Sequence, residues 1–370
     1  MNIIIYLILS FILSLLLTSA VIPQIICIAF KKRWFDTLDA RKIHHGLIPR
    51  VGGMAFVPSA IATCIMMLVA YCLLGTTDEI WPCSSSNFCL TSFVINIIAL
   101  GLIYAEGLTD DIKDIGYKVK FMVHFLCAIL VVASGIWINN FYGLFGLYEI
   151  PWFFGMPFTV LLIVYVINAI NLIDGIDGLC SGLTMVAFLF LGSLFYIHGN
   201  VIDACLSFSM LGALTSYFWF NVYGKVEKRN KIFMGDCGSQ VLGLLLSMLA
   251  VKYAMHQAEE TSSGDALIVA FSLMIIPCLD VIRVTIGRIS RGVNPFLPDK
   301  THIHHLLLAR GWSQRKARNF IIVVALFFVI LNLLLDTHIN INIIFIADIM
   351  LYMLLLLWIS KGAHTQSTKG

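Results

Sequence analysis

Charged residues are scarce in this chain. Lys, Arg, Asp and Glu make up 12% of its 370 residues, against roughly 25% in soluble globular proteins. This scarcity excludes an ordinary water-soluble enzyme, and a hydrophobic content of 59% indicates the same. The alternation of apolar and polar residues that marks a membrane β-barrel is also lacking. Internal repeats and CxxC pairs are absent as well, so neither a repeat protein nor a cysteine-based metal site is indicated.

Long apolar runs take the place of charge. A membrane-spanning helix needs about 20 apolar residues, and a backbone in hydrocarbon must satisfy its own hydrogen bonds, so runs of this length are expected to be helices. The sequence predicts eleven, near residues 3–30, 53–75, 91–108, 121–139, 155–172, 179–197, 203–221, 238–256, 266–284, 319–336 and 340–360. The predicted fold is therefore an all-α polytopic membrane protein, with residues 1–370 forming a single domain.

The basic residues fix the predicted orientation of this bundle. Residues 1–30 contain no Lys or Arg, which argues against a secretory signal, and Lys31-Lys32-Arg33 follow directly. The positive-inside rule then places the N-terminus outside and the C-terminus in the cytoplasm. With this orientation, 23 of the 24 Lys and Arg residues lie inside and only Lys252 does not. Cys83 and Cys89 share one predicted outer loop, where an oxidising compartment would permit a disulfide.

Carboxylates gather at the inner ends of the predicted helices. They are Asp110, Asp111, Asp114, Asp174, Asp177, Asp236 and Asp280. A single Asp in such a position is most simply a helix cap or a solvated charge. Seven acids on a face that is otherwise basic indicate a functional site instead.

The spacing of one motif indicates a metal. Asn168, Asn171, Asp174 and Asp177 recur every three residues, which predicts neighbours on one face of a helix. Amide and carboxylate oxygens that converge with Asp236 suit Mg²⁺, which takes a few carboxylates and completes its shell with substrate phosphates. The glycines of these motifs would let the backbone approach a phosphate closely; they are Gly175, Gly178, Gly235 and Gly238.

Two further inner loops carry candidate binding residues. The loop 283–318 holds Arg283, Arg288 and Arg291, which suit pyrophosphate through forked hydrogen bonds, although any one of them could serve orientation alone. Its histidines are His302, His304 and His305, and zinc is disfavoured because adjacent histidines do not easily share one ion. We expect them to donate to phosphate or sugar. The first inner loop is expected to contribute to the same site, through Asp36, Asp39, Arg41, Lys42, His44, Pro49, Arg50, Gly52 and Gly53.

Together these motifs carry a family resemblance. GLTDD at 107–111, NxxNLIDGIDGL at 168–179, FMGDxGS at 233–239 and HIHH at 302–305 resemble the polyprenyl-phosphate N-acetylhexosamine-1-phosphate transferases, glycosyltransferase family 4. The order of these motifs along the chain matches the family, and so does their predicted location together on the cytoplasmic side of the membrane. The HIHH form and eleven helices most resemble its undecaprenyl-phosphate N-acetylglucosamine-1-phosphate transferases. The phospho-MurNAc-pentapeptide translocase of peptidoglycan synthesis typically has three consecutive histidines and is the alternative.

The resemblance implies a reaction in the bacterial inner membrane. An N-acetylhexosamine 1-phosphate, most simply that of GlcNAc, passes from a UDP-sugar to undecaprenyl phosphate, which releases UMP and initiates a cell-surface polysaccharide such as O-antigen. Mg²⁺ is the implied cofactor, with Mn²⁺ as a substitute. The implied partners are the two substrates and membrane lipid without nucleic acid, and a homodimer is left open.

The resemblance also implies a role for each motif residue. Asn171 and Asp236 would hold the metal, and Asp110, Asp111, Asp174 and Asp177 would be catalytic, the first two at the lipid phosphate. The substrate-binding residues would be Lys120 at the lipid phosphate, Phe233 on the uracil ring, and Asn168, His302, His304 and His305 at the nucleotide sugar.

Two features lie outside this pattern. Asn221 precedes Asp236 by fifteen residues, where many relatives have about ten, so no ligand role is assigned to Asn221. A cation transporter would also use carboxylates within the membrane. It would place them near the midplane of broken, repeated helices, whereas here they lie at inner helix ends, which disfavours a transporter.

Overall fold

The computed structural model describes residues 3–35, 47–74, 86–261, 265–292, 301–335 and 338–367. In these ranges the chain is helical, without a strand. The helices are α1 (Ile3–Lys32), α2 (Gly53–Leu74), α3 (Ser86–Lys113), α4 (Tyr117–Ala133), the short 3₁₀-helix η2 (Leu144–Gly146), α5 (Trp152–Ile173), α6 (Leu179–Ile197), α7 (Val201–Tyr223), α8 (Asp236–Thr261), α9 (Asp265–Ser272), α10 (Ile275–Ile289), α11 (Ile303–Ala309), α12 (Gln314–Leu335) and α13 (Ile341–Ser367).

Each predicted apolar run contains a helix, but the run 121–139 is helical only to Ala133 and not every run is a simple span. Among the described residues, nine helices are long and apolar enough to cross a membrane. A tenth crossing results if the pair α9–α10, bent by 68°, counts as one broken span. α4 has only 17 residues, which at 1.5 Å per residue cover about 26 Å of the ~30 Å hydrocarbon core. The protein is thus a multi-pass membrane protein, and the count of eleven stays a prediction.

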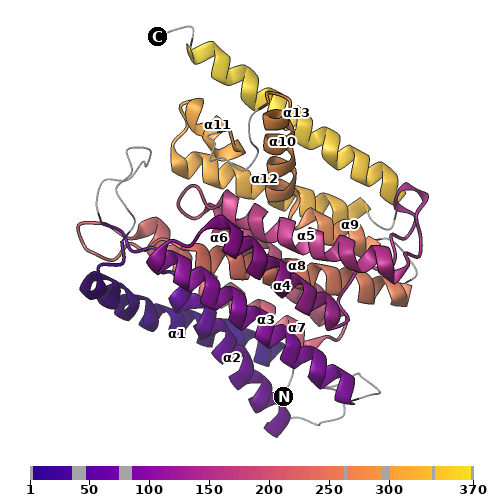
Figure 1. The fold of residues 1–370 in the computed structure, drawn as a ribbon, viewed down its shortest axis with the longest axis horizontal. Coiled ribbons are helices and arrows are strands. Elements are labelled where there is room, and N and C mark those ends of the chain that lie inside the picture. The colour runs from indigo at the N-terminus through magenta and orange to yellow at the C-terminus, as the bar shows by residue number, and fades with distance from the viewer. Residues whose placement is uncertain are drawn as a thin grey trace.

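The chain between α3 and α5 nevertheless runs from one end of the bundle to the other. The C-terminal ends of α3 and α5 lie on the same side of the bundle (Figure 1). Asp110 belongs to the last turn of α3, and Asp174 directly follows α5. The intervening α4 must therefore return towards the opposite end. Residues after α4 extend this path, and an isolated bridge joins Asn140 to Glu149 there.

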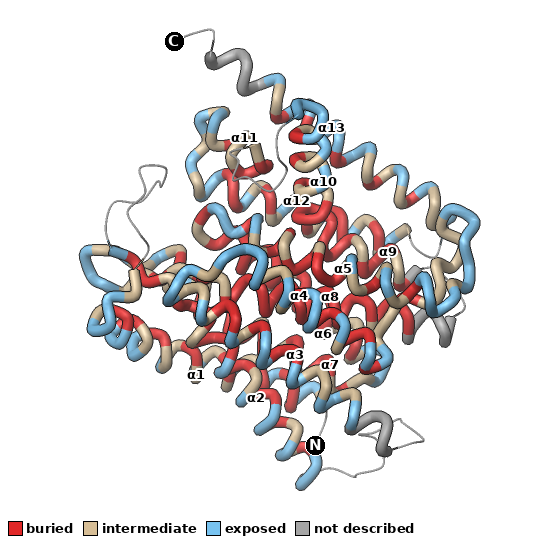
Figure 2. Tube along the Cα trace, in the orientation of Figure 1, coloured by how far each residue is buried: buried red, intermediate tan, exposed pale blue. Residues whose placement is uncertain are grey.

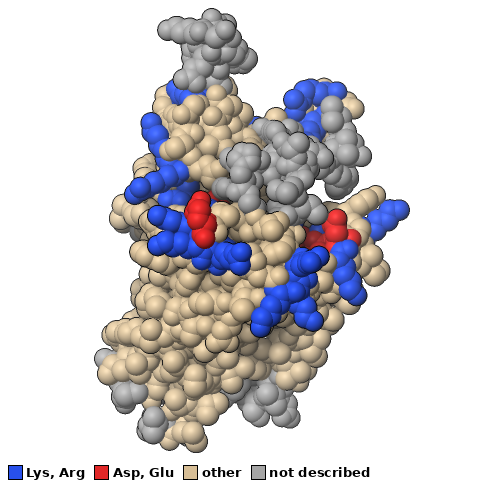
Figure 3. All heavy atoms as spheres, turned by 90° about the vertical axis from the view of Figure 1, so that its left-hand side faces the viewer, with Lys and Arg blue, Asp and Glu red and all other residues tan. Residues whose placement is uncertain are grey.

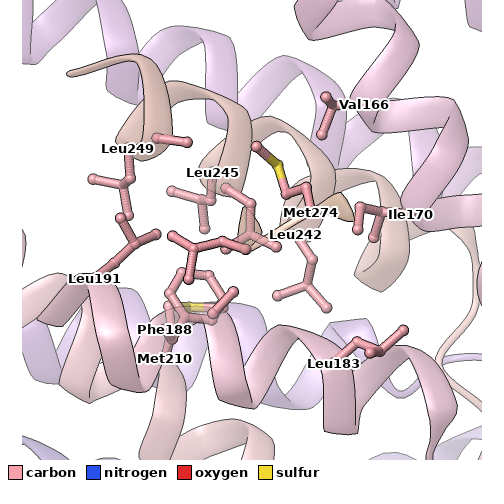
Figure 4. Packing of buried hydrophobic residues seen from close by; sticks show 14 of the residues in the cluster. Val166, Ile170, Leu183, Phe188, Leu191, Met210, Leu242, Leu245, Leu249 and Met274 are labelled. Atoms are coloured by element: carbon pink, nitrogen blue, oxygen red, sulfur yellow. The ribbon is translucent and has the colours of Figure 1, made fainter. Parts of the chain in front are cut away.

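α8 is the central helix of the bundle. It packs against α2, α3, α5, α6 and α9. In its membrane-spanning part 94% of the residues are buried, compared with 28% in the peripheral helices α1 and α13 (Figure 2). A helix that is apolar all round is covered either by other helices or by lipid, and α8 is covered by other helices. Leu242, Leu245 and Leu249 of α8 pack here among side chains of α5, α6 and α7 (Figure 4).

This packing brings the start of α8 against two other helices. Gly53 and Gly107 permit the approach: a β-carbon on Gly53 would lie 2.4 Å from Cys237 Sγ, and one on Gly107 would lie 2.5 Å from Cys237 Cα. Only glycine fits at these two contacts. Because α3, α5 and α8 all present their acidic ends there, the apolar core positions the polar residues. Figure 3 views this end of the bundle, where Lys and Arg side chains surround acidic ones.

Some sequence predictions fall outside the described residues. These are the pairing of Cys83 with Cys89, whose side chains are not described, and the contributions of Asp36, Asp39, Arg41, Lys42 and His44 from the first inner loop.

Candidate active site

The segment before α8 is held in place by the first inner loop. Phe233 N donates to Pro49 O at 2.8 Å, Gly52 N donates to Phe233 O at 2.8 Å, and Gly53 N donates to Met234 O at 2.9 Å. These three bonds align the loop along the FMGD motif. Phe233 is half-buried, and stacking on a base would require part of its ring to be accessible.

Asp111 caps the N-terminus of α8. Its Oδ1 accepts a hydrogen bond from Asp236 N at 2.7 Å and its Oδ2 accepts one from Cys237 N at 3.1 Å. A carboxylate at this position satisfies N–H groups that lack helical partners and complements the helix dipole. Gly235 makes room with a left-handed φ of 75°, because a β-carbon there would lie 2.4 Å from Asp111 Oδ2. The sequence motif did not reveal this capping role.

Lys120 joins two of the predicted site carboxylates. Its ammonium lies 2.5 Å from Asp110 Oδ2 and 2.8 Å from Asp236 Oδ2. The other oxygen of Asp110 accepts a bond from Ile115 N at 2.8 Å. Asp110 and Asp236 are mostly buried, with 8% and 13% of their side chains exposed, whereas Lys120 keeps 23%. The Lys120 ammonium thereby links the acidic end of α3 to the first residue of α8.

A second cation and an amide complete the surroundings of Asp236. Arg50 Nη2 lies 3.7 Å from Asp236 Oδ1 with 43% of the Arg50 side chain exposed. Gln240, one turn into α8, donates to Asp236 Oδ2 at 3.2 Å. The sequence grouped Arg50 only loosely with the site and did not identify Gln240, because a Gln inside an apolar run gives no motif signal.

One predicted metal ligand, Asn171, contacts the first turn of α8, which the other predicted ligand, Asp236, begins. Asn171 Nδ2 donates to Ser239 Oγ at 2.8 Å, which commits the amide nitrogen and leaves the amide oxygen as an acceptor beside the turn that Asp236 begins. Among the described residues, no group of three or more His, Cys, Asp or Glu side chains could hold a metal ion. This excludes a zinc-type cage within that part of the chain. One carboxylate and one amide suit Mg²⁺, which relies on substrate phosphates and water for its remaining ligands.

The Asn168–Asp177 motif does not continue as one helical face. α5 ends at Ile173, and Asp174 is its C-cap with φ −76° and ψ 50°. The prediction of a single face is therefore wrong for Asp174 and Asp177, because the Gly-rich turn after Ile173 ends the helix. Asn168 turns its amide back to the carbonyl of Val164 at 2.7 Å.

Asp177 and Asn221 brace the turn that follows α5. Lys231 Nζ donates to Asp177 Oδ2, and Arg318 Nη1 donates to Asp177 O at 3.3 Å. The buried Asn221 accepts a bond from Gly178 N at 2.7 Å and donates to Ile232 O at 2.9 Å. Both ends of the Asn221 amide are used for bracing, which agrees with the absence of a ligand assignment from the sequence.

Asp174 is exposed in the turn after α5, although many protein atoms lie around its carboxyl. Partial desolvation raises the pKa of Asp174 to about 7; Arg50 opposes this shift, and the charges of Asp177 and Asp236 add to it. A carboxyl whose pKa is raised by its surroundings and by neighbouring acids is typical of a functional site.

We expect the replacement Asp174→Asn to stabilise the protein at alkaline pH. The folded-state pKa of Asp174, about 7, exceeds the ordinary value of about 3.9. The folded protein therefore binds more protons than the unfolded one between these values, and its stability falls as pH rises through this window. Asp174→Asn should remove that fall. Melting temperatures in detergent at pH 5 and pH 8 measure it; a variant–wild-type difference that is equal at both pH values would contradict the assignment.

The histidine loop reaches the turn after α5. Gly175 packs on the ring of His304, whose Nε2 would lie 2.1 Å from a β-carbon at Gly175. The rings of His302 and His304 are stacked, with centroids 6.0 Å apart and an angle of 4° between their planes. The ring centroid of His305 lies 4.2 Å from that of His304. Burial lowers the pKa of His304 to about 3, helped by the other two histidines, so His304 is neutral. The His304 ring thus lies against Gly175, the residue that follows Asp174, and the substrate-orienting role of the three histidines stays a prediction.

Asp280 orients the first of these histidines. The fully buried Asp280 accepts from His302 Nδ1 at 2.8 Å, from Ile303 N at 3.1 Å and from Arg283 Nη2 at 2.7 Å. Arg283 also donates to the carbonyl of Thr301. Bonding at Nδ1 fixes the ring and leaves Nε2 of His302 for a substrate. Arg283 therefore holds the loop in place, a role that the sequence did not separate from phosphate binding.

Comparison with known proteins agrees with this arrangement. Residues 92–254 match the glycosyl transferase family 4 model. The undecaprenyl-phosphate alpha-N-acetylglucosaminyl 1-phosphate transferase of Yersinia pestis is 30% identical over 294 residues, 78% of this chain and 73% of the relative. The protein of the same name from Escherichia coli strain K12 is 28% identical over 294 residues, again 78% of this chain and 73% of the relative. A Bacillus subtilis protein named as a probable undecaprenyl-phosphate N-acetylglucosaminyl 1-phosphate transferase is 28% identical over 330 residues, 89% of this chain and 84% of the relative.

The matched region contains the acidic end of α3, Lys120, the motif that ends α5 and the start of α8. The resemblance seen in the motifs is thereby confirmed over most of the chain. The chain belongs to glycosyl transferase family 4.

Proposed function

We propose that this protein transfers GlcNAc 1-phosphate from UDP-GlcNAc to undecaprenyl phosphate in a bacterial inner membrane, giving undecaprenyl-pyrophosphoryl-GlcNAc and UMP. The observation that supports this most directly is Lys120, held between Asp110 and Asp236 where the apolar bundle ends. A lipid phosphate would arrive at this level from the membrane. The relatives are named as undecaprenyl-phosphate N-acetylglucosaminyl 1-phosphate transferases, that of Bacillus subtilis as a probable one, which favours GlcNAc over the MurNAc-pentapeptide alternative. The product would begin a cell-surface polysaccharide.

The reaction requires the protein mainly to position the two substrates and to stabilise the charge on their phosphates. An oxygen of the lipid phosphate attacks the β-phosphorus of UDP-GlcNAc, and the bond from that phosphorus to the bridging oxygen breaks, so UMP leaves. Lys120 would hold the attacking phosphate in line, and Asp110 would fix the Lys120 ammonium or accept a proton. Arg50 and His302 would contact the pyrophosphate and sugar from the other side.

Mg²⁺ fits the remaining donors. When bound, it supplies charge neutralisation for the pyrophosphate, and Asn171 and Asp236 would hold it. Support comes from the amide oxygen of Asn171 lying beside the turn that Asp236 begins, and from the positive charge that Asp236 already attracts from Lys120 and Arg50. Mn²⁺ would serve as a substitute.

The direct test is an assay of purified protein. UMP release is measured with undecaprenyl phosphate and each of several UDP-sugars. The proposal expects UMP with UDP-GlcNAc, dependent on the lipid. Release with UDP-MurNAc-pentapeptide alone would establish the translocase alternative instead, and lipid-independent release would overturn both.

The affinity for the nucleotide should depend on Phe233. Phe233→Ala is expected to raise the KM for UDP-GlcNAc by about 5- to 100-fold, because stacking on a base is worth ~1–3 kcal/mol. The KM for the lipid should change little. Calorimetric titration with UDP checks this directly. If the ring only packs, Phe233→Ala should lower the melting temperature and leave UDP affinity at the wild-type value.

The orientation can be tested separately. We propose that the N-terminus lies outside and the C-terminus in the cytoplasm, since the site face is the one rich in Lys and Arg (Figure 3). A reporter that is active only in the cytoplasm, fused after Gly370, should therefore be active. A matched fusion after Gly199, at the other end of α6, should be silent. The opposite pattern would reverse the topology.

A further inference from the structure

A second layer of polar side chains lies one helical turn deeper than the site. Glu106 precedes Asp110 by four residues on α3, and His124 follows Lys120 by four residues on α4. Positions four apart share a helix face, and α3 packs against α4. The two helices therefore carry two stacked pairs, Asp110 with Lys120 and Glu106 with His124.

The deeper pair is almost completely buried. His124 Nε2 lies 3.8 Å from Glu106 Oε2, and 3% of each side chain is exposed. Among the described residues neither oxygen of Glu106 and neither nitrogen of His124 has a hydrogen-bond partner. α8 repeats the pattern, since Gln240 follows Asp236 by one turn and its buried Oε1 is also without a partner.

Such a pair is stable only in a restricted charge state. Burying an ion without a partner is costly, and an imidazolium next to the carboxylate offsets that cost. With one shared proton the pair has no net charge, whichever side chain carries it. Without that proton a single negative charge would lie one turn below Lys120 and would compete with Asp110 for its ammonium.

The neighbours do not supply another counter-charge. On α3 the near carboxylates are Asp110 and Asp111, which already bind Lys120 and the N-terminus of α8. On α4 the buried thiol of Cys127 lies in range of Glu106 and donates to Ala99 O at 3.3 Å.

The other packed helices add little. α8 presents Asp236, bound by Lys120, and the buried Cys237. α5 packs against α4 and carries one titratable side chain, Tyr165, whose hydroxyl donates to Cys278 O. His124 is therefore the group that can balance Glu106.

We propose that Glu106 and His124 are a positioning pair that keeps Lys120 available to the acceptor phosphate by holding one shared proton beneath it. The pair does not touch substrate; it acts through Lys120. This role rests on the proposed function, in which Lys120 binds the lipid phosphate. It makes the affinity for that phosphate, and not for the nucleotide, depend on His124.

The test compares His124→Gln, Glu106→Gln and the double variant. The probe is a short-chain polyprenyl phosphate, and its Kd is measured in detergent at pH 6 and pH 8 without nucleotide. Each Kd is divided by the wild-type value at the same pH, which cancels the titration of the phosphate itself. His198→Gln, an exposed histidine at the end of α6, is the matched control, and UDP titration confirms that each variant is folded.

The proposal predicts an asymmetric result. His124→Gln leaves the Glu106 charge without its balancing group and should weaken lipid-phosphate binding about 10-fold at pH 8, with a smaller loss at pH 6, where a buried carboxylate without a counter-charge is more easily neutralised. Glu106→Gln and the double variant leave no such charge and should stay within about 3-fold at both pH values. UDP affinity should be unchanged throughout.

Other patterns overturn the pair. Equal weakening in both single variants and the double variant indicates packing alone, and so does a loss in His124→Gln that is the same at both pH values. If His124→Gln does not fold, a 10-fold loss in the double variant overturns the proposal and wild-type-like binding supports it. Absence of UMP release together with the predicted Kd pattern would contradict the proposed function and leave the pair intact.

Discussion

Asp236→Ala is expected to abolish turnover while the protein remains folded. Asp236 attracts Lys120, Arg50 and Gln240 and begins the central helix, and in the proposed function it also holds Mg²⁺. Losing one carboxylate that organises these charges should cost at least about 10²–10³ in rate, equivalent to several kcal/mol. The fold should survive because Asp111 accepts the backbone N–H groups at positions 236 and 237, which the substitution retains.

UMP release and the melting temperature in detergent together test this expectation. Glu149→Gln, an exposed carboxylate at the opposite end of the bundle, is the control and should match wild type. Excess EDTA should lower the wild-type rate to that of Asp236→Ala, and added Mg²⁺ should restore the wild type only. A near-normal rate in Asp236→Ala would contradict the role assigned to this residue. Full activity in EDTA would contradict the proposed dependence on Mg²⁺.

Asp111 should show a different signature, in which stability and activity fall together. Asp111→Ala removes both hydrogen bonds to the N-terminus of α8, and loss of an N-terminal cap costs about 0.5–2 kcal/mol. The first turn of α8 carries Asp236, so its misplacement should lower kcat by about 10²-fold, since a displacement of about 1 Å can have that effect. Asp111→Asn keeps one acceptor oxygen and should fall between Asp111→Ala and wild type in both measurements.

The comparison with Asn separates capping from catalysis. If the Asp111 charge served the lipid phosphate directly, Asp111→Asn would lose as much activity as Asp111→Ala and keep the wild-type melting temperature. Glu227→Gln, an exposed acid in the loop before α8, controls for the loss of one negative charge on this face. Asp110→Asn should lower kcat with UDP affinity retained, because Asp110 fixes Lys120, whereas Asp111 holds the backbone N–H groups that begin α8.

The membrane class and the inner grouping of the acids could be predicted from the sequence because both depend on local features. An apolar run of about 20 residues must be helical in hydrocarbon wherever it lies, and the positive-inside rule needs only the loop charges. The glycine-rich acidic motifs are likewise contiguous. Family membership followed from the same short segments and was confirmed over most of the chain.

The sequence was less informative about helix limits. The three-residue spacing in the Asn168–Asp177 motif predicted a continuous face, but α5 ends at Ile173. Glycines 175 and 178 favour a turn, and the ion pair of Asp177 with Lys231 stabilises it from a distant segment. A short apolar run likewise does not reveal whether a helix spans the core alone, as α4 does not, or bends by 68°, as α9–α10 do.

The partners of each polar side chain were decided by tertiary structure alone. Lys120 bonds to Asp236 across 116 positions of the chain, and Asp111 caps a helix that begins 125 residues later. Apolar helices of similar composition carry no pairing code in their sequence; their neighbours are set by shape, including the close approach that Gly53 and Gly107 allow at α8. The sequence by itself determined which groups lie at the helix ends on one side of the bundle, and packing around α8 determined which of them touch.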